Sequence, residues 1–416
     1  MKPAGTNAGG IHAPGINAVG WYFTALQFLF ALSWTVYVIF LPPLADRAGI
    51  ERSQIIWILM ADQVIFALMD VAMGAAADRV VSAYQRYARW LLLLSLASCA
   101  AFLILPFATG GGPVLFVALI FIWSATSSAL RAPPLVLIGR YAALPAHAWL
   151  AGLTVLGLGL SGAVSPYIAF RLRTIDPAIP FVACNLALAV VTLGLTWAAK
   201  RLGEGTPAAP TEGGLGLRAP LVAGFLAAAL LAGAGFQLHT AINSVPQYMR
   251  FAGQGELENL LPLFWVGFNL MVLPACGLAR RAGALTVMAG AGIAGAGALA
   301  LAAAAGSLPV LIAAQLAAGA AWSVLLMGAI TAALALGHTG SEGKINGSLF
   351  ALLALAAFAR MGMVAAQLPG DPDLAPLLPW VPVAAWAAAG VLLVLVWAAA
   401  RKSARGAPRL SLTGSA

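Results

Sequence analysis

Long apolar segments, separated by short groups of charged or turn-forming residues, make up most of the chain. Residues 90–130, 141–170 and 177–199 contain no Asp, Glu, Lys or Arg. A membrane-crossing helix needs about 20 such residues. The polar/apolar alternation in segments of about ten that a membrane β-barrel needs is absent. The pattern therefore predicts an all-α membrane protein that crosses the bilayer many times.

Dividing the apolar segments at charges and Gly/Pro turns predicts twelve transmembrane helices. The first six lie near 20–44, 53–76, 89–108, 113–138, 147–170 and 177–199, and the second six near 219–248, 257–279, 284–305, 308–336, 345–368 and 377–400. The longest polar, Gly/Pro-rich stretch separates the two groups. We therefore expect an N-terminal tail (1–19), a six-helix half (20–199), a linker (200–218), a second six-helix half (219–400) and a C-terminal tail (401–416).

The composition supports a lipid environment and explains the positive net charge. Hydrophobic residues make up 62% of the 416 residues and charged residues only 8%, whereas soluble domains carry about 25% charged residues. With both termini in the cytoplasm, most of the 22 Lys and Arg fall on the cytoplasmic side, as the positive-inside rule requires. The net charge of +9 thus predicts a cell (inner) membrane protein with cytoplasmic termini and gives no reason to expect nucleic acid.

Charge collects in the loop after the second predicted helix, which begins "GAAADR" at Gly74. The small residues allow two helices to approach closely. Asp78, at the helix end, can pair with Arg79 or face the positive N-terminus of a neighbouring helix. A related segment, "GLARRAG", begins at Gly277 after the eighth predicted helix.

These two loops resemble the Gly-x-Leu-Ala-Asp-Arg-x-Gly signature of the major facilitator superfamily. The first matches it at Gly74, Ala77, Asp78 and Arg79, with Ala76 in place of Leu and Val81 in place of the second Gly; the second matches at Leu278, Ala279, Arg281 and Gly283, with Arg280 in place of the acid. The resemblance implies two pseudo-repeated six-helix halves and alternating access. It also implies a cytoplasmic gate, to which it assigns Gly74, Asp78, Arg79, Arg280 and Arg281.

Four charged residues lie well inside predicted helices, away from the helix ends: Asp62, Asp70, Arg131 and Arg360. A lone charge at the bilayer centre costs about 2.5–3.5 kcal/mol on insertion scales, so each needs a partner or water. At about 1.5 Å per residue, Asp62 and Arg360 both lie about 21–22 Å from the cytoplasmic ends of their helices. Asp70 and Arg131 lie about 9–11 Å from theirs.

Helices two and eleven meet in the superfamily, and helices two and four are neighbours. An Asp62–Arg360 bridge that opens and closes and a static Asp70–Arg131 pair are therefore expected, with direct substrate or proton binding as the alternative for each. A carboxyl group in a low-dielectric site can exchange a proton near neutral pH. Asp62, and after it Asp70, are the proton-coupling candidates.

Polar and aromatic faces on several helices indicate a central cavity. The candidates for its lining are Gln27, Trp34, Tyr37, Trp123, Arg131, Gln237, His239, Asn243, Trp265, Asn269 and Arg360. Helices one, four, seven and ten line the cavity in the superfamily. The alternative is hydrogen bonding between helices, worth about 0.6 kcal/mol each, and His239 in particular fits a structural role.

The resulting hypothesis is a secondary transporter that moves a small organic solute with proton coupling. The segment "GLGLSGAVSPYIAF" from Gly157 is similar to the antiporter signature of drug exporters, with Ser165 in place of Gly, and favours export. The alternative is an importer of an anionic metabolite, with Arg131 and Arg360 as substrate clamps. A third hypothesis is a non-transporting membrane receptor, which would usually carry a large soluble extension.

Enzymatic activity is not expected, because the four histidines (His12, His147, His239 and His338) are scattered and form no catalytic or metal-binding constellation. Cys99, Cys184 and Cys276 lie inside predicted helices without metal-like spacing. The phosphate-binding Gly-x-x-x-x-Gly-Lys-Ser/Thr loop of ATP-driven proteins is absent. The sequence therefore predicts no metal and no cofactor, and a protein that functions as a monomer with its substrate, protons and the lipid bilayer as partners.

Overall fold

The computed structural model describes residues 15–80, 84–142, 144–172, 174–203, 220–337 and 340–406. These residues form twelve helical stretches that are long and apolar enough to cross a membrane, and none of them forms a β-strand. Each of the twelve predicted helices corresponds to one stretch, so the prediction of a multi-pass α-helical membrane protein is confirmed. Most of the predicted tails and linker lie outside the described residues, as do His12, Val81, Arg173, Arg218 and His338.

The first six spans contain eight α-helices. They are α1 (Ile16–Arg47), α2 (Arg52–Val80), α3 (Tyr84–Ile104), α4 (Gly112–Ser127), α5 (Pro133–Tyr141), α6 (Leu144–Arg171), α7 (Ala178–Thr192) and α8 (Leu195–Gly203). Short 3₁₀ turns, η1 (Leu105–Phe107), η2 (Thr109–Gly111) and η3 (Ser128–Leu130), extend or join them.

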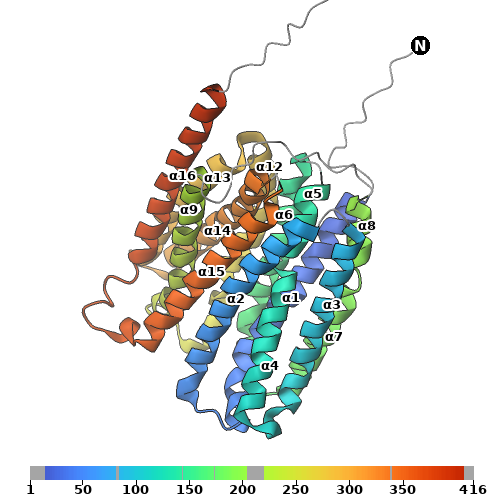
Figure 1. Ribbon diagram of the computed structural model, residues 1–416. Helices are drawn as coiled ribbons and strands as arrows, with labels where there is room; N and C mark the ends of the chain where they lie inside the picture. The colour runs from blue at the N-terminus through green and yellow to red at the C-terminus, as the bar shows by residue number, and fades with distance from the viewer. Residues whose placement is uncertain are drawn as a thin grey trace, which may run out of the picture.

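The last six spans are built in the same way. They comprise α9 (Pro220–Leu238), η4 (His239–Asn243), α10 (Ser244–Met249), η5 (Gln254–Glu256), α11 (Leu257–Leu260), α12 (Pro262–Ala282), α13 (Ala284–Ala303), α14 (Leu308–Gly337), α15 (Glu342–Ala365), η6 (Leu368–Gly370) and α16 (Val381–Gly406). The first residues of α1 and the last residues of α16 lie at the same end of the bundle (Figure 1). We call this end the termini end.

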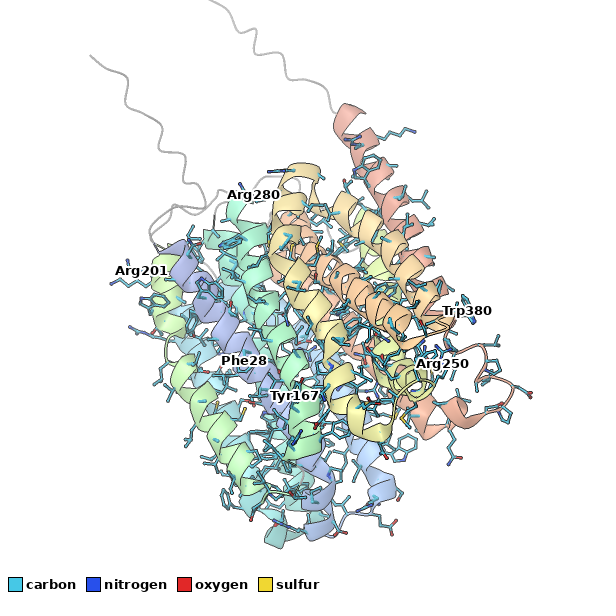
Figure 2. All side chains as sticks on the ribbon, turned by 180° about the vertical axis from the view of Figure 1, so that it is seen from behind. Phe28, Tyr167, Arg201, Arg250, Arg280 and Trp380 are labelled. Atoms are coloured by element: carbon cyan, nitrogen blue, oxygen red, sulfur yellow. The ribbon has the colours of Figure 1, made fainter. Side chains whose placement is uncertain are left out.

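Basic side chains distinguish the two ends of the bundle. Arg201 and Arg280 lie toward the termini end, whereas Arg250 lies toward the opposite end, near Trp380 (Figure 2). Arg281 follows Arg280 in the last turn of α12, and Arg79 lies in the last turn of α2; both are exposed. This distribution is the one that the positive-inside rule associates with the cytoplasmic face.

The fourth span is broken in its middle, between α4 and α5. Pro134 has no backbone N–H and cannot donate to the carbonyl oxygen of Leu130 one turn earlier. The side-chain amide of Gln27 on α1 donates to that oxygen instead, at 2.8 Å. The break therefore costs no unsatisfied carbonyl at Leu130, and it leaves Arg131 at the junction of the two helices.

The seventh span contains a wide π-helical turn, η4, just before Pro246. The Ser244 hydroxyl donates to the His239 carbonyl oxygen at 2.9 Å and so satisfies a backbone group within this turn. Turns of this kind inside α-helices often occur at functional sites. Here the turn directs His239 and Asn243 into the protein interior, where both are buried.

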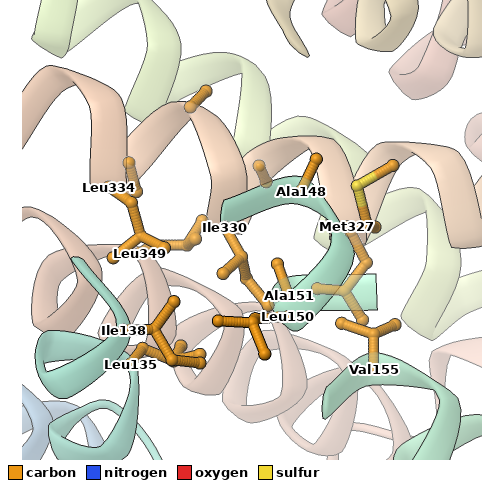
Figure 3. Packing of buried hydrophobic residues seen from close by; sticks show 14 of the residues in the cluster. Leu135, Ile138, Ala148, Leu150, Ala151, Val155, Met327, Ile330, Leu334 and Leu349 are labelled. Atoms are coloured by element: carbon orange, nitrogen blue, oxygen red, sulfur yellow. The ribbon is translucent and has the colours of Figure 1, made fainter. Parts of the chain in front are cut away.

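Apolar side chains from both halves pack together between the cavity described below and the termini end. We call this group, formed by Leu135, Ile138, Leu150, Ala151, Ile330, Leu334 and Leu349, the apolar plug (Figure 3). These residues come from α5 and α6 in the first half and from α14 and α15 in the second, and all are at most 2% exposed. The side chains of the plug are thus closed to solvent, and together they join the two halves on this side.

Glycines allow the closest helix contacts within the second half. A Cβ atom at Gly319 of α14 would overlap the carbonyl oxygen of Phe264 on α12, whereas one at Gly290 of α13 would meet nothing within 4 Å. Small residues at such crossings are how membrane helices gain packing contacts, because lipid offers no hydrophobic driving force between them.

Gly319→Ala should therefore destabilise the protein by about 1–3 kcal/mol, the usual effect of overfilling a packed interface. Gly290→Ala should leave the stability unchanged or raise it slightly, because alanine favours the helix. Thermal unfolding of the two purified variants in detergent tests this difference. Equal melting temperatures would show that the crossing of α12 and α14 is not tightly packed.

Candidate functional site

A cavity of about 400 Å³ lies between the two halves of the bundle. This volume is within the range of small-molecule binding pockets. Of the predicted cavity residues, those that line it are Gln27, Trp34, Arg131, Gln237, Trp265 and Arg360. Tyr37, Trp123, His239, Asn243 and Asn269 are not among the lining residues, and for these five the predicted cavity position is wrong.

Aromatic rings from both halves surround the cavity. Phe30, Trp34 and Phe66 contribute from the first half, and Phe236, Trp265, Trp322 and Phe350 from the second. Phe236 and Trp322 stack with ring centroids 4.4 Å apart, and Trp34 meets Phe66 edge-on at 5.3 Å. The ring contacts hold these side chains in place, so that the cavity offers preformed flat apolar surfaces.

Asp62 lies beside the cavity but faces the interior of the first half. Its two carboxylate oxygens accept hydrogen bonds from Tyr37 of α1 and Ser124 of α4, both at 2.7 Å. The predicted bridge from Asp62 to Arg360 is therefore wrong for this structure. The helices that carry the two residues do meet nearby, since the end of the Met60 side chain on α2 lies near Gly362 of α15. Asp62 nevertheless points toward α1 and α4, and its neighbour Gln63 lines the cavity instead.

Asp70 and Arg131 form the predicted pair between the second and fourth spans. A guanidinium nitrogen of Arg131 lies 3.3 Å from a carboxylate oxygen of Asp70, whose side chain is 0% exposed. Neither Asp70 oxygen has a hydrogen-bond partner among the described residues, so the contact is an ion pair without a hydrogen bond. Arg131 also lies 4.7 Å from the ring centre of Phe66 and 5.7 Å from that of Phe350.

Arg360 differs from Arg131 because the structure gives it no partner. It lines the cavity, and its buried Nε has no hydrogen-bond acceptor. Within the described parts of the chain, the salt bridges that the structure contains join other residues. Arg360 is therefore a half-buried charged group at the cavity wall that has no counter-ion among the described residues.

The polar residues around η4 form a network behind the cavity wall. The His239 Nε2 lies 2.9 Å from the side-chain oxygen of Gln315 on α14, and the Gln315 amide donates to Gln247 at 3.3 Å. Asn243 donates to the carbonyl oxygen of Leu378 at 2.9 Å. These contacts correspond to the structural role considered for His239. They also explain why His239 and Asn243 do not reach the cavity.

The last predicted cavity residue, Asn269, lies on the face of α12 that meets α6. A Cβ atom at Gly159 of α6 would overlap the Asn269 side-chain oxygen. Asn269 is thus part of a contact between the halves rather than part of the cavity wall.

Contacts at the termini end close the cavity on that side. Asp78 accepts hydrogen bonds from the backbone N–H groups of Gly343 at 2.7 Å and Lys344 at 2.9 Å. These groups belong to the first turn of α15, whose N–H groups lack partners within their own helix. Of the two contacts considered for Asp78, the structure forms the one with a neighbouring helix N-terminus. A carboxylate there is also favoured by the helix dipole.

Two further features strengthen this closure. Gly74 of α2 lies so close to Gly343 and Gly347 of α15 that no Cβ would fit. Arg140 of α5 pairs with Glu342 of α15 at 3.2 Å, and the Glu342 side chain is only 3% exposed. Arg79, Arg280 and Arg281, which were also predicted to belong to the gate, are exposed and appear in none of the salt bridges that the described residues form.

Sequence reasoning missed several residues of the site. Arg140 and Glu342 lie near helix ends, where charged residues are expected for topology alone. They are about 200 positions apart in the sequence, so no local pattern predicts that they pair. Gln63 was missed because its neighbour Asp62 carries the stronger signal. Phe30 was a usable clue, because it is one turn from both Gln27 and Trp34 on the same helix face.

Comparisons with known proteins agree with this geometry. Neither the protein-family models nor the curated proteins provide a match to the sequence. Solved structures do match, across almost the whole chain. A bacterial homologue of the iron transporter ferroportin in an outward-facing state is 13% identical, with a TM-score of 0.72, covering 91% of this chain and 99% of its own.

Two other similar structures belong to transporters of different solutes. The major facilitator superfamily transporter FucP in the outward conformation is 13% identical, with a TM-score of 0.64 and coverage of 90% and 97%. The human organic anion transporter MFSD10 is 14% identical, with a TM-score of 0.64 and coverage of 92% and 99%. The chain therefore has the fold of the major facilitator superfamily, as the two signature-like loops indicated.

Replacing Asp78 by asparagine should loosen the termini end. Asparagine keeps one acceptor for the two N–H groups of α15 and loses the charge, and a hydrogen bond to a charged group is worth about 1.5–3 kcal/mol. The measurement uses spin labels at positions 86 and 280, in a protein whose three native cysteines are replaced by alanine. In the Asp78→Asn variant, the population of molecules with a longer label-to-label distance should be roughly tenfold larger than in the parent. Arg79→Gln, at an exposed neighbouring position, should not change the distances.

The Asp70–Arg131 pair should be strongly coupled. Arg131→Gln leaves a fully buried carboxylate without its counter-ion, which costs about 3–5 kcal/mol for buried pairs. The double variant Asp70→Asn/Arg131→Gln should recover most of this loss, because neither charge remains. Thermal unfolding of the single and double variants gives the coupling. Losses that simply add in the double variant would contradict a direct interaction.

Proposed function

We propose that this protein is a secondary transporter that carries a small organic solute across the membrane by alternating access. The observation that supports it best is the cavity between the two halves, which the apolar plug and the Asp78 contacts close on one side. The fold is that of a superfamily of transporters. A closed contact built from a few hydrogen bonds, one ion pair and apolar side chains can open without unfolding either half.

The two halves, residues 20–199 and 219–400, are the moving units of this proposal, and residues 200–218 link them. The distribution of basic residues supports a cytoplasmic termini end in a cell (inner) membrane. The side closed by the apolar plug and the Asp78 contacts would then be the cytoplasmic side. At the opposite end, Arg171 of α6 donates to Glu258 of α11 at 2.8 Å, a contact that joins the halves where the cavity would open. One chain contains the whole cavity, which is consistent with function as a monomer.

Asp62 is the proposed proton-binding group. Its carboxylate accepts from Tyr37 and Ser124 at once, and protonation would remove one of its acceptor positions. Tyr37 contacts Trp34 at a centroid distance of 5.3 Å, and Trp34 lines the cavity. Proton binding at Asp62 can therefore change the cavity wall through two side-chain contacts. Among proteins with this fold, one similar structure is described as an E. coli fucose:proton symporter.

Asp70 is the weaker candidate for proton coupling. Its counter-ion Arg131 stabilises the ionised form, and the rings of Phe66 and Phe350 lie against the Arg131 guanidinium. The same pairing removes Arg131 as a substrate clamp, because its charge is already compensated. The gate function proposed for Gly74 and Asp78 extends to Arg140 and Glu342, since these residues form the contacts between the halves.

Proton-linked alternating access can be tested without knowing the substrate. Spin-label pairs at positions 86 and 280, and at positions 52 and 375 at the opposite end, report the two sides in lipid nanodiscs. In the protein with native Asp62, a change from pH 8 to pH 5 should shift the two distances in opposite directions. Asp62→Asn, which resembles the protonated form, should show the pH 5 distances at both pH values.

The control is Asp373→Asn, at an exposed acidic residue, which should keep the full response to pH. Tyr37→Phe should reduce the response, because it removes one of the two donors to Asp62. An Asp62→Asn variant with an unchanged pH response would rule out Asp62 as the coupling site. Distances that change together, or at one end only, under all these conditions would argue against alternating access itself.

A further inference from the structure

The charges that face the cavity are unbalanced. Among the described residues that line it, the charged ones are Arg131 and Arg360, and none is an Asp or Glu. Arg131 is compensated by Asp70 behind it. Asp62 is not among the lining residues, and both of its carboxylate oxygens accept hydrogen bonds, from Tyr37 and Ser124. Arg360 is therefore the charged residue of the cavity wall that forms no ion pair among the described residues.

Arg360 is placed to use that charge on a bound molecule. It lies on α15, where the close contacts of Gly343 and Gly347 with α2 hold the helix against the other half. Its Nε is buried and has no acceptor. Leaving a guanidinium donor without a partner costs free energy, and a planar fork of donors matches a carboxylate well. Gln63 also lines the cavity and can supply a further amide donor.

The rest of the cavity wall has a different chemistry. The stacked pair Phe236 and Trp322 from the second half, and Trp34 and Phe66 from the first, present ring faces or edges to the same space. Such surfaces bind flat, apolar groups. A small sugar or an inorganic ion would leave most of this apolar surface without contacts.

We propose that the cavity binds an organic monoanion, with its carboxylate on Arg360 and a flat apolar body between the aromatic side chains of the two halves. The proposal rests on the proposed transport function in so far as the bound anion would be the transported solute. The binding itself can be tested without measuring transport. One free arginine matches one negative charge, so a dianion would leave a charge uncompensated in the cavity.

The test compares probes that share one ring system and differ in charge. They are 2-naphthoate, its neutral amide 2-naphthamide, the cation 2-naphthylmethylamine, the dianion 2-naphthyl phosphate, and acetate as an anion without an apolar body. Binding to the purified full-length protein is measured by calorimetry and by thermal stabilisation, which increases with ligand concentration over Kd. We expect 2-naphthoate to bind roughly 10- to 100-fold more tightly than the amide, as for a hydrogen bond to a charged group. Acetate should not bind measurably.

Variants assign the effect to Arg360. Arg360→Gln should weaken 2-naphthoate binding to the level of the amide and leave amide binding unchanged, and Arg360→Lys should retain part of the preference. Arg52→Gln, which removes an exposed arginine at the start of α2, should not change any affinity. Because Arg360 has no partner, Arg360→Gln should not lower the melting temperature of the empty protein, which separates a binding role from a structural one.

Several results would overturn the proposal. These are binding of the amide or the amine as tightly as 2-naphthoate, tighter binding of the phosphate, an unchanged 2-naphthoate affinity in Arg360→Gln, or no binding of 2-naphthoate at all. The spin-label distances judge the transport function separately. Reciprocal distance changes without selective binding of 2-naphthoate would leave the transporter proposal intact and refute the substrate class. Selective binding of 2-naphthoate without distance changes would support the substrate class and argue against the transporter proposal.

Discussion

The structure depends on one constraint, which is that polar groups in helices surrounded by lipid must find partners inside the protein. Asp62 meets it with Tyr37 and Ser124, and Asp70 with Arg131. The carbonyl oxygen of Leu130, left without a donor by Pro134, meets it through Gln27. Several buried polar atoms in the described spans lack a hydrogen-bond partner. Arg360 is informative among them because it is charged, forms none of the ion pairs of the described residues and lines the cavity.

The same constraint connects the two halves at the termini end. The first N–H groups of α15 need acceptors, and Asp78 at the end of α2 provides two. This contact is reachable only because Gly74, Gly343 and Gly347 let the two helices approach closely. The apolar plug, of which Leu135 and Ile330 also line the cavity, packs between the two halves (Figure 3). Closure thus combines a few directional polar contacts with apolar packing, an arrangement that can separate and re-form.

Depth in the membrane could be estimated from sequence, but direction around the helix axis could not. Counting residues from the helix ends placed Asp70 level with Arg131, and the pair forms. The same count placed Asp62 level with Arg360, yet Asp62 faces α1 and α4 while Gln63 takes the cavity position. Neighbouring residues on a helix point in directions about 100° apart, and in these uniformly apolar helices no amphipathic pattern identifies the inner face.

By itself, the sequence determined the twelve membrane-crossing helices and the position of each intramembrane charge along its helix. These follow from local rules, since helix length, apolar runs and terminal charges depend on residues near each other in the chain. Only the tertiary structure decided which charges are paired, that Arg140 meets Glu342 and that Arg360 remains free. Those outcomes depend on how helices rotate and cross, which packing between residues distant in sequence settles.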